Sequence, residues 1–102
     1  MIPVAVLNSW YVENKDIFVS RCNEHEFDDS GRGSAEVTLE TERYIVSLCA
    51  WDHNCCLDIQ VLEIRSEESN FLHTGECPSI AEFKEHLNRF SVWFNNEAKE
   101  NA

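Results

Sequence analysis

The sequence is poor in basic residues. Only 8 Lys and Arg stand against 19 Asp and Glu among 102 residues, which leaves a formal net charge of −11 at pH 7. A chain of this charge repels nucleic acids and anionic membrane surfaces, because no basic stripe offsets its field. The same field attracts cations, so it favours a protein partner with a basic surface.

Glycine and proline are also scarce, with 3 and 2 residues. No apolar run reaches the roughly 18 residues of a membrane span. The first seven residues carry no Lys or Arg, and Asn8 and Ser9 interrupt their apolar run, so we expect no signal peptide and a cytoplasmic protein. An apolar content of 43% excludes disorder, and the length predicts a single domain over 1–102 with a frayed tail over about 97–102.

The cysteines do not form a disulfide framework. Their number is odd, and the chain shows no export signal, so reduced thiols are expected. The five are Cys22, Cys49, Cys55, Cys56 and Cys77.

Two segments have helical periodicity. Apolar side chains form one stripe over residues 5–24, and a second stripe begins at about Ile80. Ser79 and Glu82 make a capping box at the start of the second helix. A polar loop with two glycines, over 28–34, is the clearest break in the chain.

Residues 35–64 predict three strands, with breaks at Thr41-Glu42 and His53-Asn54, and residues 70–75 predict a fourth strand at the edge. We therefore predict an α+β fold. It is an antiparallel three- to four-stranded meander, with the N- and C-terminal helices packed on one face as a two-layer sandwich.

The strand pairing follows if both turns contain two residues. The second hairpin then pairs Ala50 with Leu57, Leu48 with Ile59, and Val46 with Val61. The first pairs Leu39 with Tyr44, Val37 with Val46, and Ala35 with Leu48. All of these positions are apolar, and a slip of one residue would turn carboxylates into the core.

The other sheet face is then left without helices and is the predicted binding surface. Burying the Trp51 ring there would contribute roughly 2–3 kcal/mol, the scale of an interface anchor. The alternatives are that Trp51 is covered and belongs to the core, and that the carboxylates are a solvated face. The residues expected on this face are Glu36, Thr38, Glu40, Arg43, Ile45, Ser47, Cys49, Trp51, Cys56, Asp58, Gln60, Leu62 and Ile64. We assign partner binding to Glu36, Glu40, Ile45, Trp51, Asp58, Gln60 and Leu62.

An acidic run follows the first predicted helix and is expected to be solvated, because it lies beside the glycine-containing loop. It can add a secondary acidic rim to a surface for a basic partner. Its members are Glu24, Glu26, Asp28 and Asp29.

The sequence gives little support for catalysis or metal binding. His53, Cys55, His73 and Cys77 are the candidates for a metal or enzymatic site, and only His73 and Cys77 have a suitable ligand spacing. His86 reads as an ordinary polar residue of the last helix. We expect no enzyme activity, no cofactor and no metal.

A tryptophan ends one strand, a tight turn follows, and the next strand carries an acidic residue, all between two helices. The passages are 36–51 and 56–64, EVTLETERYIVSLCAW and CLDIQVLEI. They resemble immunity proteins of bacterial polymorphic toxin systems, and in particular the TriTu family, over about residues 5–94. TriTu proteins are partners of Rhs-type ADP-ribosyltransferase toxins that act on elongation factor Tu, in a setting of type VI secretion.

The resemblance implies a cytoplasmic inhibitor that binds one antibacterial toxin domain and occludes its active site. No contact residues follow from it, so the binding residues named above come from the strand register alone. A small acidic secretion chaperone, which would bind an unfolded segment and usually dimerise, is the alternative. A second alternative is a metal-binding or enzymatic domain.

Overall fold

The computed structural model describes the backbone of residues 2–100 and their side chains, except those of residues 71 and 97–100. Three helices, α1 (Pro3–Glu13), α2 (Lys15–Arg21) and α3 (Ile80–Glu100), accompany one sheet. The sheet is an antiparallel meander in the order β1-β2-β3-β4-β5. Its strands are β1 (Glu24–Asp29), β2 (Ser34–Glu40), β3 (Tyr44–Trp51), β4 (Cys56–Glu63) and β5 (Ser69–His73).

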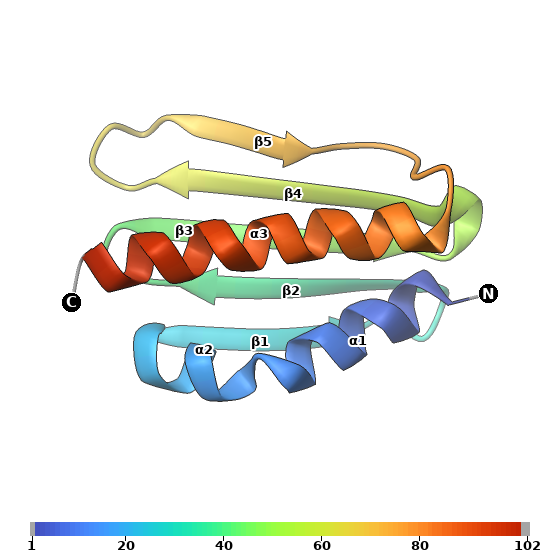
Figure 1. Ribbon diagram of the computed structural model, residues 1–102, viewed down its shortest axis with the longest axis horizontal. Coiled ribbons are helices and arrows are strands. Elements are labelled where there is room, and N and C mark those ends of the chain that lie inside the picture. The colour runs from blue at the N-terminus through green and yellow to red at the C-terminus, as the bar shows by residue number, and fades with distance from the viewer. Residues whose placement is uncertain (1, 101–102) are drawn as a thin grey trace.

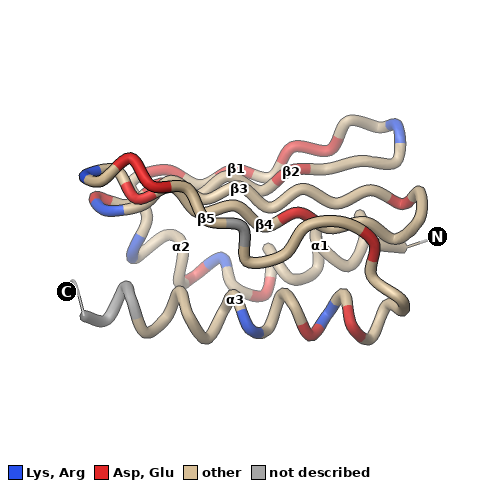
Figure 2. Tube along the Cα trace, turned by 90° about the horizontal axis from the view of Figure 1, so that it is seen from above, with Lys and Arg blue, Asp and Glu red and all other residues tan. Residues whose placement is uncertain are grey.

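The fold has two layers, as predicted. The three helices lie against one face of the sheet (Figure 1), and the view from above shows them all on the same side (Figure 2). The core lies between the layers, where β-strand side chains of alternating positions meet the apolar helix stripes. Its largest fully buried side chains include Leu7, Phe18, Leu48, Ile59, Phe83 and Phe90. Trp10 Nε1 also donates to Ser91 Oγ at 2.8 Å, which joins α1 to α3.

The first helical segment is divided in two and ends earlier than expected. Asn14 stands between α1 and α2 with φ −101° and ψ 5°. Its side-chain Nδ2 donates to the Trp10 carbonyl at 2.8 Å, and such local bonds compete with the helical ladder. The prediction of one helix over 5–24 was therefore wrong at Asn14 and over 22–24, because α2 ends at Arg21.

Strand β1 is an additional strand where the sequence predicted a solvated run. Its residues alternate, with His25 and Phe27 turned toward the core and Glu24, Glu26 and Asp28 exposed. Acidic residues are depleted in strands, but at a sheet edge they also prevent pairing with other chains. The predicted loop over 28–34 is accordingly shorter, since it lies between β1 and β2.

The second hairpin has the predicted register. Ala50 pairs with Leu57, Leu48 with Ile59, and Trp51 with Cys56. The loop between them has a 3-10 turn over His53–Cys55, in which Asn54 adopts φ 58°, a conformation that asparagine tolerates.

The first hairpin is displaced by two residues from the predicted register. Leu39 pairs with Val46 rather than with Tyr44, and Val37 pairs with Leu48. The cause is Thr41, whose Oγ1 accepts from Arg43 N at 3.2 Å and from Tyr44 N at 2.9 Å, so the turn forms after Thr41. A shift of two residues preserves the alternation of faces, and the division into inner and outer side chains stands.

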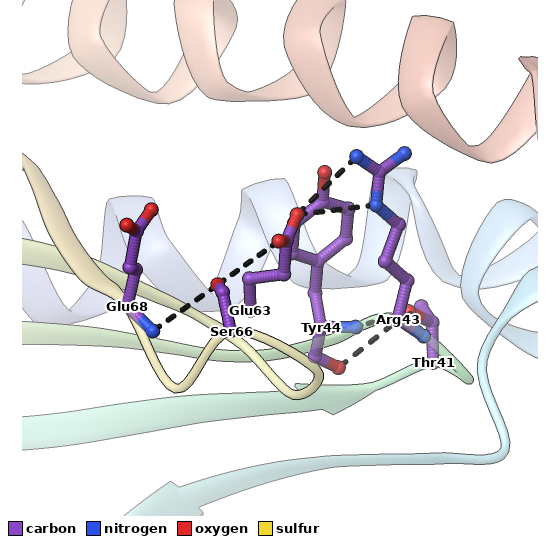
Figure 3. A network of polar contacts seen from close by, with 6 residues as sticks. All are labelled: Thr41, Arg43, Tyr44, Glu63, Ser66 and Glu68. Carbon is purple, nitrogen blue, oxygen red and sulfur yellow. Dashed lines mark hydrogen bonds and ion pairs between the residues drawn. The ribbon is translucent and has the colours of Figure 1, made fainter.

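Figure 3 shows this turn beside the β4–β5 connection. Arg43 was predicted on the helix-free face, but its Cζ lies 5.1 Å from the ring centroid of Tyr44, a core residue. Its guanidinium pairs with Glu63 at 3.2 Å. Ser66 Oγ donates to the same carboxylate at 3.0 Å, which holds the start of the β4–β5 turn.

The C-terminal half follows the prediction closely. The fourth predicted strand is β5, and α3 begins at Ile80, where Ser79 Oγ accepts from Glu82 N at 3.2 Å. Helix α3 extends to Glu100, and residues 101–102 of the tail expected to fray lie outside the described part.

Candidate functional site

The face of the sheet opposite the helices, here called the open face, is the candidate site. Three rows of paired residues cross it. The first is Asp28, Glu36, Cys49 and Asp58; the second is Glu26, Thr38, Ser47 and Gln60; the third is Glu24, Glu40, Ile45 and Leu62. No helix of the described residues lies on this side of the sheet (Figure 2), which leaves it accessible to a partner.

Apolar side chains lie among the carboxylates. Trp51 is 36% exposed and Ile45 is 38% exposed, while Leu62, the neighbour of Ile45, is half-buried. The alternative that Trp51 is sealed in the core is therefore wrong. An accessible aromatic ring within a polar surround is the arrangement of an interface anchor.

The five strands carry no Lys or Arg. Every Lys and Arg of the described helices, strands and turns lies in a helix or a connection, and the charges in Figure 2 follow this division. The eight positions are Lys15, Arg21, Arg32, Arg43, Arg65, Lys84, Arg89 and Lys99. The open face consequently presents six carboxylates without a strand-borne counter-charge, and its potential is negative.

Two of the cross-strand pairs on this face join like charges. Glu24 is opposite Glu40, and Asp28 is opposite Glu36. Directly opposed like charges destabilise a sheet, by about 0.2–1 kcal/mol on the usual scale of cross-strand pairs. An open hollow lined by Asn23, Glu24, His25, Glu26, Thr38 and Glu40 marks this corner.

Hydrogen bonds hold Glu36 in place beside Cys49. Glu36 Oε2 accepts from Ser47 Oγ at 2.7 Å and from Cys49 Sγ at 3.4 Å. Burial raises the pKa of the Cys49 thiol, and the negative charge of Glu36 adds to that effect. Cys49 is therefore a protonated thiol at neutral pH and no activated nucleophile.

Asp58 fixes the connection that follows β5. Its Oδ1 accepts from Thr74 Oγ1 at 2.7 Å and from the backbone N–H of Gly75 at 3.0 Å. Glu36 and Asp58 lie on either side of Cys49, two strands apart, which is about 10 Å at the usual strand spacing. One partner surface can therefore contact both carboxylates.

A cluster of residues whose types can ligate a metal lies elsewhere, between β5 and α3. The structure brings His73 and Cys77 together, with Nε2 and Sγ 3.5 Å apart, and adds His86. Burial raises the pKa of the Cys77 thiol to about 11, and burial lowers the pKa of His86. A thiol of that pKa is a poor nucleophile, so the geometry gives no support for Cys–His catalysis.

The model of one protein family, described as immunity protein TriTu, matches residues 6–93. The chain belongs to the TriTu immunity-protein family. Comparisons with curated proteins and with solved structures found no match. Membership of this family indicates that the protein neutralises a toxin and that its partner is the toxin protein. It also supports an inhibitory rather than an enzymatic role for the chain. No described helix is both long and apolar enough to cross a membrane.

This TriTu-family chain places most of the predicted residues on the open face. Glu36, Glu40, Ile45, Trp51, Asp58, Gln60 and Leu62 are all there. The predicted rim is not separate: Glu24, Glu26 and Asp28 extend the same surface through β1. Asp29, the fourth predicted rim residue, is not in the three rows. Its Oδ1 accepts a hydrogen bond from Gly31 N, in the β1–β2 loop, at 2.8 Å.

Sequence reasoning missed two features. The membership of β1 in the sheet was signalled by the alternation of acidic residues with His25 and Phe27. The approach of His86 to His73 had no local signal, since the two residues belong to different elements.

Proposed function

We propose that this protein neutralises a cognate antibacterial toxin domain, of the ADP-ribosyltransferase class that acts on elongation factor Tu, by laying its open face over the toxin's active site. The observation that carries the proposal is a helix-free sheet face with six carboxylates, no strand-borne Lys or Arg, and the accessible ring of Trp51. Inhibition is stoichiometric, because the open face acts by steric exclusion and performs no reaction.

The like-charge pairs support a basic partner. Glu24–Glu40 and Asp28–Glu36 lower the stability of the free sheet, and a cationic surface laid over them would relieve that repulsion. Stability lost at a surface is a frequent consequence of selection for function. Relief of this repulsion would therefore add to the free energy of binding a basic partner.

The two kinds of side chain contribute differently to binding. The carboxylates accelerate encounter with a basic surface, in a manner that salt weakens, and they discriminate against acidic partners. Trp51 contributes to the lifetime of the complex, because its ring loses its remaining contact with water.

The test is a growth-rescue assay with the toxin domain encoded beside this gene, combined with transfer of labelled ADP-ribose to elongation factor Tu in vitro. Wild-type protein should restore growth and abolish transfer at one chain per toxin. The variant E36Q/E40Q/W51A/D58N should fail in both, while its amides retain the carbonyl oxygens that hold Ser47, Thr74 and Gly75.

A matched variant separates the open face from general loss of charge. E13Q/D16N/E85Q/V92A also removes three carboxylates and one apolar group, all from exposed positions of the helical layer. It should rescue growth as the wild type does. Rescue by the open-face variant, or equal failure of both variants when both are folded, would contradict the proposed docking surface.

A further inference from the structure

His73, Cys77 and His86 form a compact cluster at the junction of β5, the following connection and α3. Each offers one ligand atom, and these atoms all lie within 4.8 Å of one another. The imidazole rings of His73 and His86 are stacked, with centroids 3.8 Å apart. Cys77 is buried, with 4% exposure, and both histidines are half-buried. The cluster lies outside the open face, and the proposed toxin binding makes no use of it.

The backbone around the cluster is fixed independently of these side chains. Cys77 N donates to the Cys55 carbonyl at 2.9 Å, and Leu57 N donates to the Gly75 carbonyl at 2.9 Å. Asp58 holds the same connection from the open-face side. Two ligands are thus attached to β4 through a short, well-bonded segment, and the third is carried by a helix. Ligands on rigid elements are the basis of a preorganised site.

His86 faces the cluster because of its place on α3. It lies three residues after Phe83 and one before Leu87, and both of these are fully buried against the sheet. Glu82 lies one helical turn before His86, and its charge acts on both Cys77 and His86. The cluster therefore has a carboxylate on the same helix as His86, one turn away.

The donor set selects a class of metal ion. Two imidazole nitrogens and one thiolate sulfur suit Zn²⁺ and its chemical neighbours, whereas Mg²⁺ and Ca²⁺ require oxygen. In a tetrahedral zinc site, bonds of about 2.0–2.1 Å to nitrogen and 2.3 Å to sulfur place those two atoms about 3.6 Å apart. The distance from Cys77 Sγ to His73 Nε2 is 3.5 Å. The His73 and His86 rings are stacked, so coordination of one ion by both requires the His86 ring to turn about its side-chain bonds.

We propose that His73, Cys77 and His86 bind one zinc-class ion, with the fourth position left to water. On binding, Cys77 gives up its thiol proton to solvent and coordinates as the thiolate. The ion joins β5, an edge strand of the sheet, to α3. Its effect is to stabilise this end of the fold.

The test uses the full chain, stripped with a chelator under reducing conditions and then titrated with Co²⁺ and with Zn²⁺. Wild-type protein should bind one equivalent of Co²⁺, with the absorption of a thiolate-ligated tetrahedral ion, and Zn²⁺ should displace it. Zn²⁺ should also raise the melting temperature. C77S and H86Q should each weaken Zn²⁺ binding at least tenfold, measured by competition with a chromophoric chelator.

Two control variants keep the result specific. H53Q removes an exposed histidine and C49S removes a half-buried thiol of the open face, and both should bind Zn²⁺ as the wild type does. Because Cys77 is buried and C77S can fail to fold, H86Q carries the test on its own. A wild-type chain that binds less than 0.2 equivalents would overturn the proposal. So would undiminished affinity in folded H86Q, in which case His73 and Cys77 form only their hydrogen bond.

Discussion

Replacing Trp51 with alanine tests the anchor of the open face. The residue is 36% exposed, and because a tryptophan side chain presents up to about 250 Å², about 90 Å² remains for a partner to cover. At about 25 cal/mol per Å², covering that area contributes about 2 kcal/mol, or a factor of roughly 30 in Kd. We expect W51A to weaken toxin binding by this factor, mainly through faster dissociation.

The assay is calorimetry or surface-immobilised kinetics with the isolated toxin domain. V92A is the control, since Val92 is 62% exposed on α3 and its loss should leave Kd within a factor of two. Circular dichroism and thermal unfolding must show that W51A retains its fold. Equal affinities of wild-type protein and W51A would refute the assignment of Trp51 to the interface, and so would a larger effect of V92A.

Three further predictions concern charge, core and thiols. E40Q should raise the free energy of unfolding of the free chain by about 0.2–1 kcal/mol in urea titrations, because Glu24 no longer faces a like charge. A lower free energy of unfolding in E40Q would contradict the proposed repulsion. The same variant should associate with the toxin more slowly and with a weaker salt dependence. F83A should lower the free energy of unfolding by about 3–5 kcal/mol, because Phe83 is completely buried between the layers. A decrease below about 1 kcal/mol would show that the Phe83 side chain is not part of a tightly packed core. Burial raises the pKa of Cys22 to about 11, so at pH 8 only about one Cys22 thiol in a thousand is ionised. Labelling of Cys22 by iodoacetamide, followed by mass spectrometry, should accordingly be slow at pH 8 and accelerate about tenfold for each pH unit up to pH 11, whereas a plateau below pH 9 would exclude this pKa.

The layers and the face of each strand were predictable because they depend on periodicity. Val37 and Ile59 alternate with polar residues at a spacing of two, and any even register places them in the core. The division of the sheet into a helix-covered face and an open face follows from that alternation together with two amphipathic helices. This is why the predicted binding residues lie on one surface.

The position of the first turn was not predictable from periodicity. The register with Leu39 opposite Tyr44 and the observed one with Leu39 opposite Val46 bury side chains of the same strand faces. The choice between them depends on two hydrogen bonds to the Thr41 hydroxyl, a local interaction worth about 1 kcal/mol each. Hydrophobic patterning does not resolve differences of that kind.

Strand β1 and the His86 cluster were missed for different physical reasons. β1 is an edge strand with one neighbour, and its acidic composition resembles that of a loop even though Phe27 packs on the core. His86 reaches His73 only after α3 has packed against the sheet, so no sequence spacing connects them. The first could have been found from alternation, and the second required the tertiary structure.

Side-chain footprinting of the toxin complex tests the central claim most directly. Hydroxyl radicals oxidise accessible tryptophan and thiol groups, and mass spectrometry reports the change at each residue. We predict that complex formation protects Trp51 and Cys49 on the open face and leaves Trp93, on α3, as reactive as in the free chain. Protection of Trp93 with unchanged oxidation of Trp51 would show that the toxin binds the helical layer, and would contradict the account.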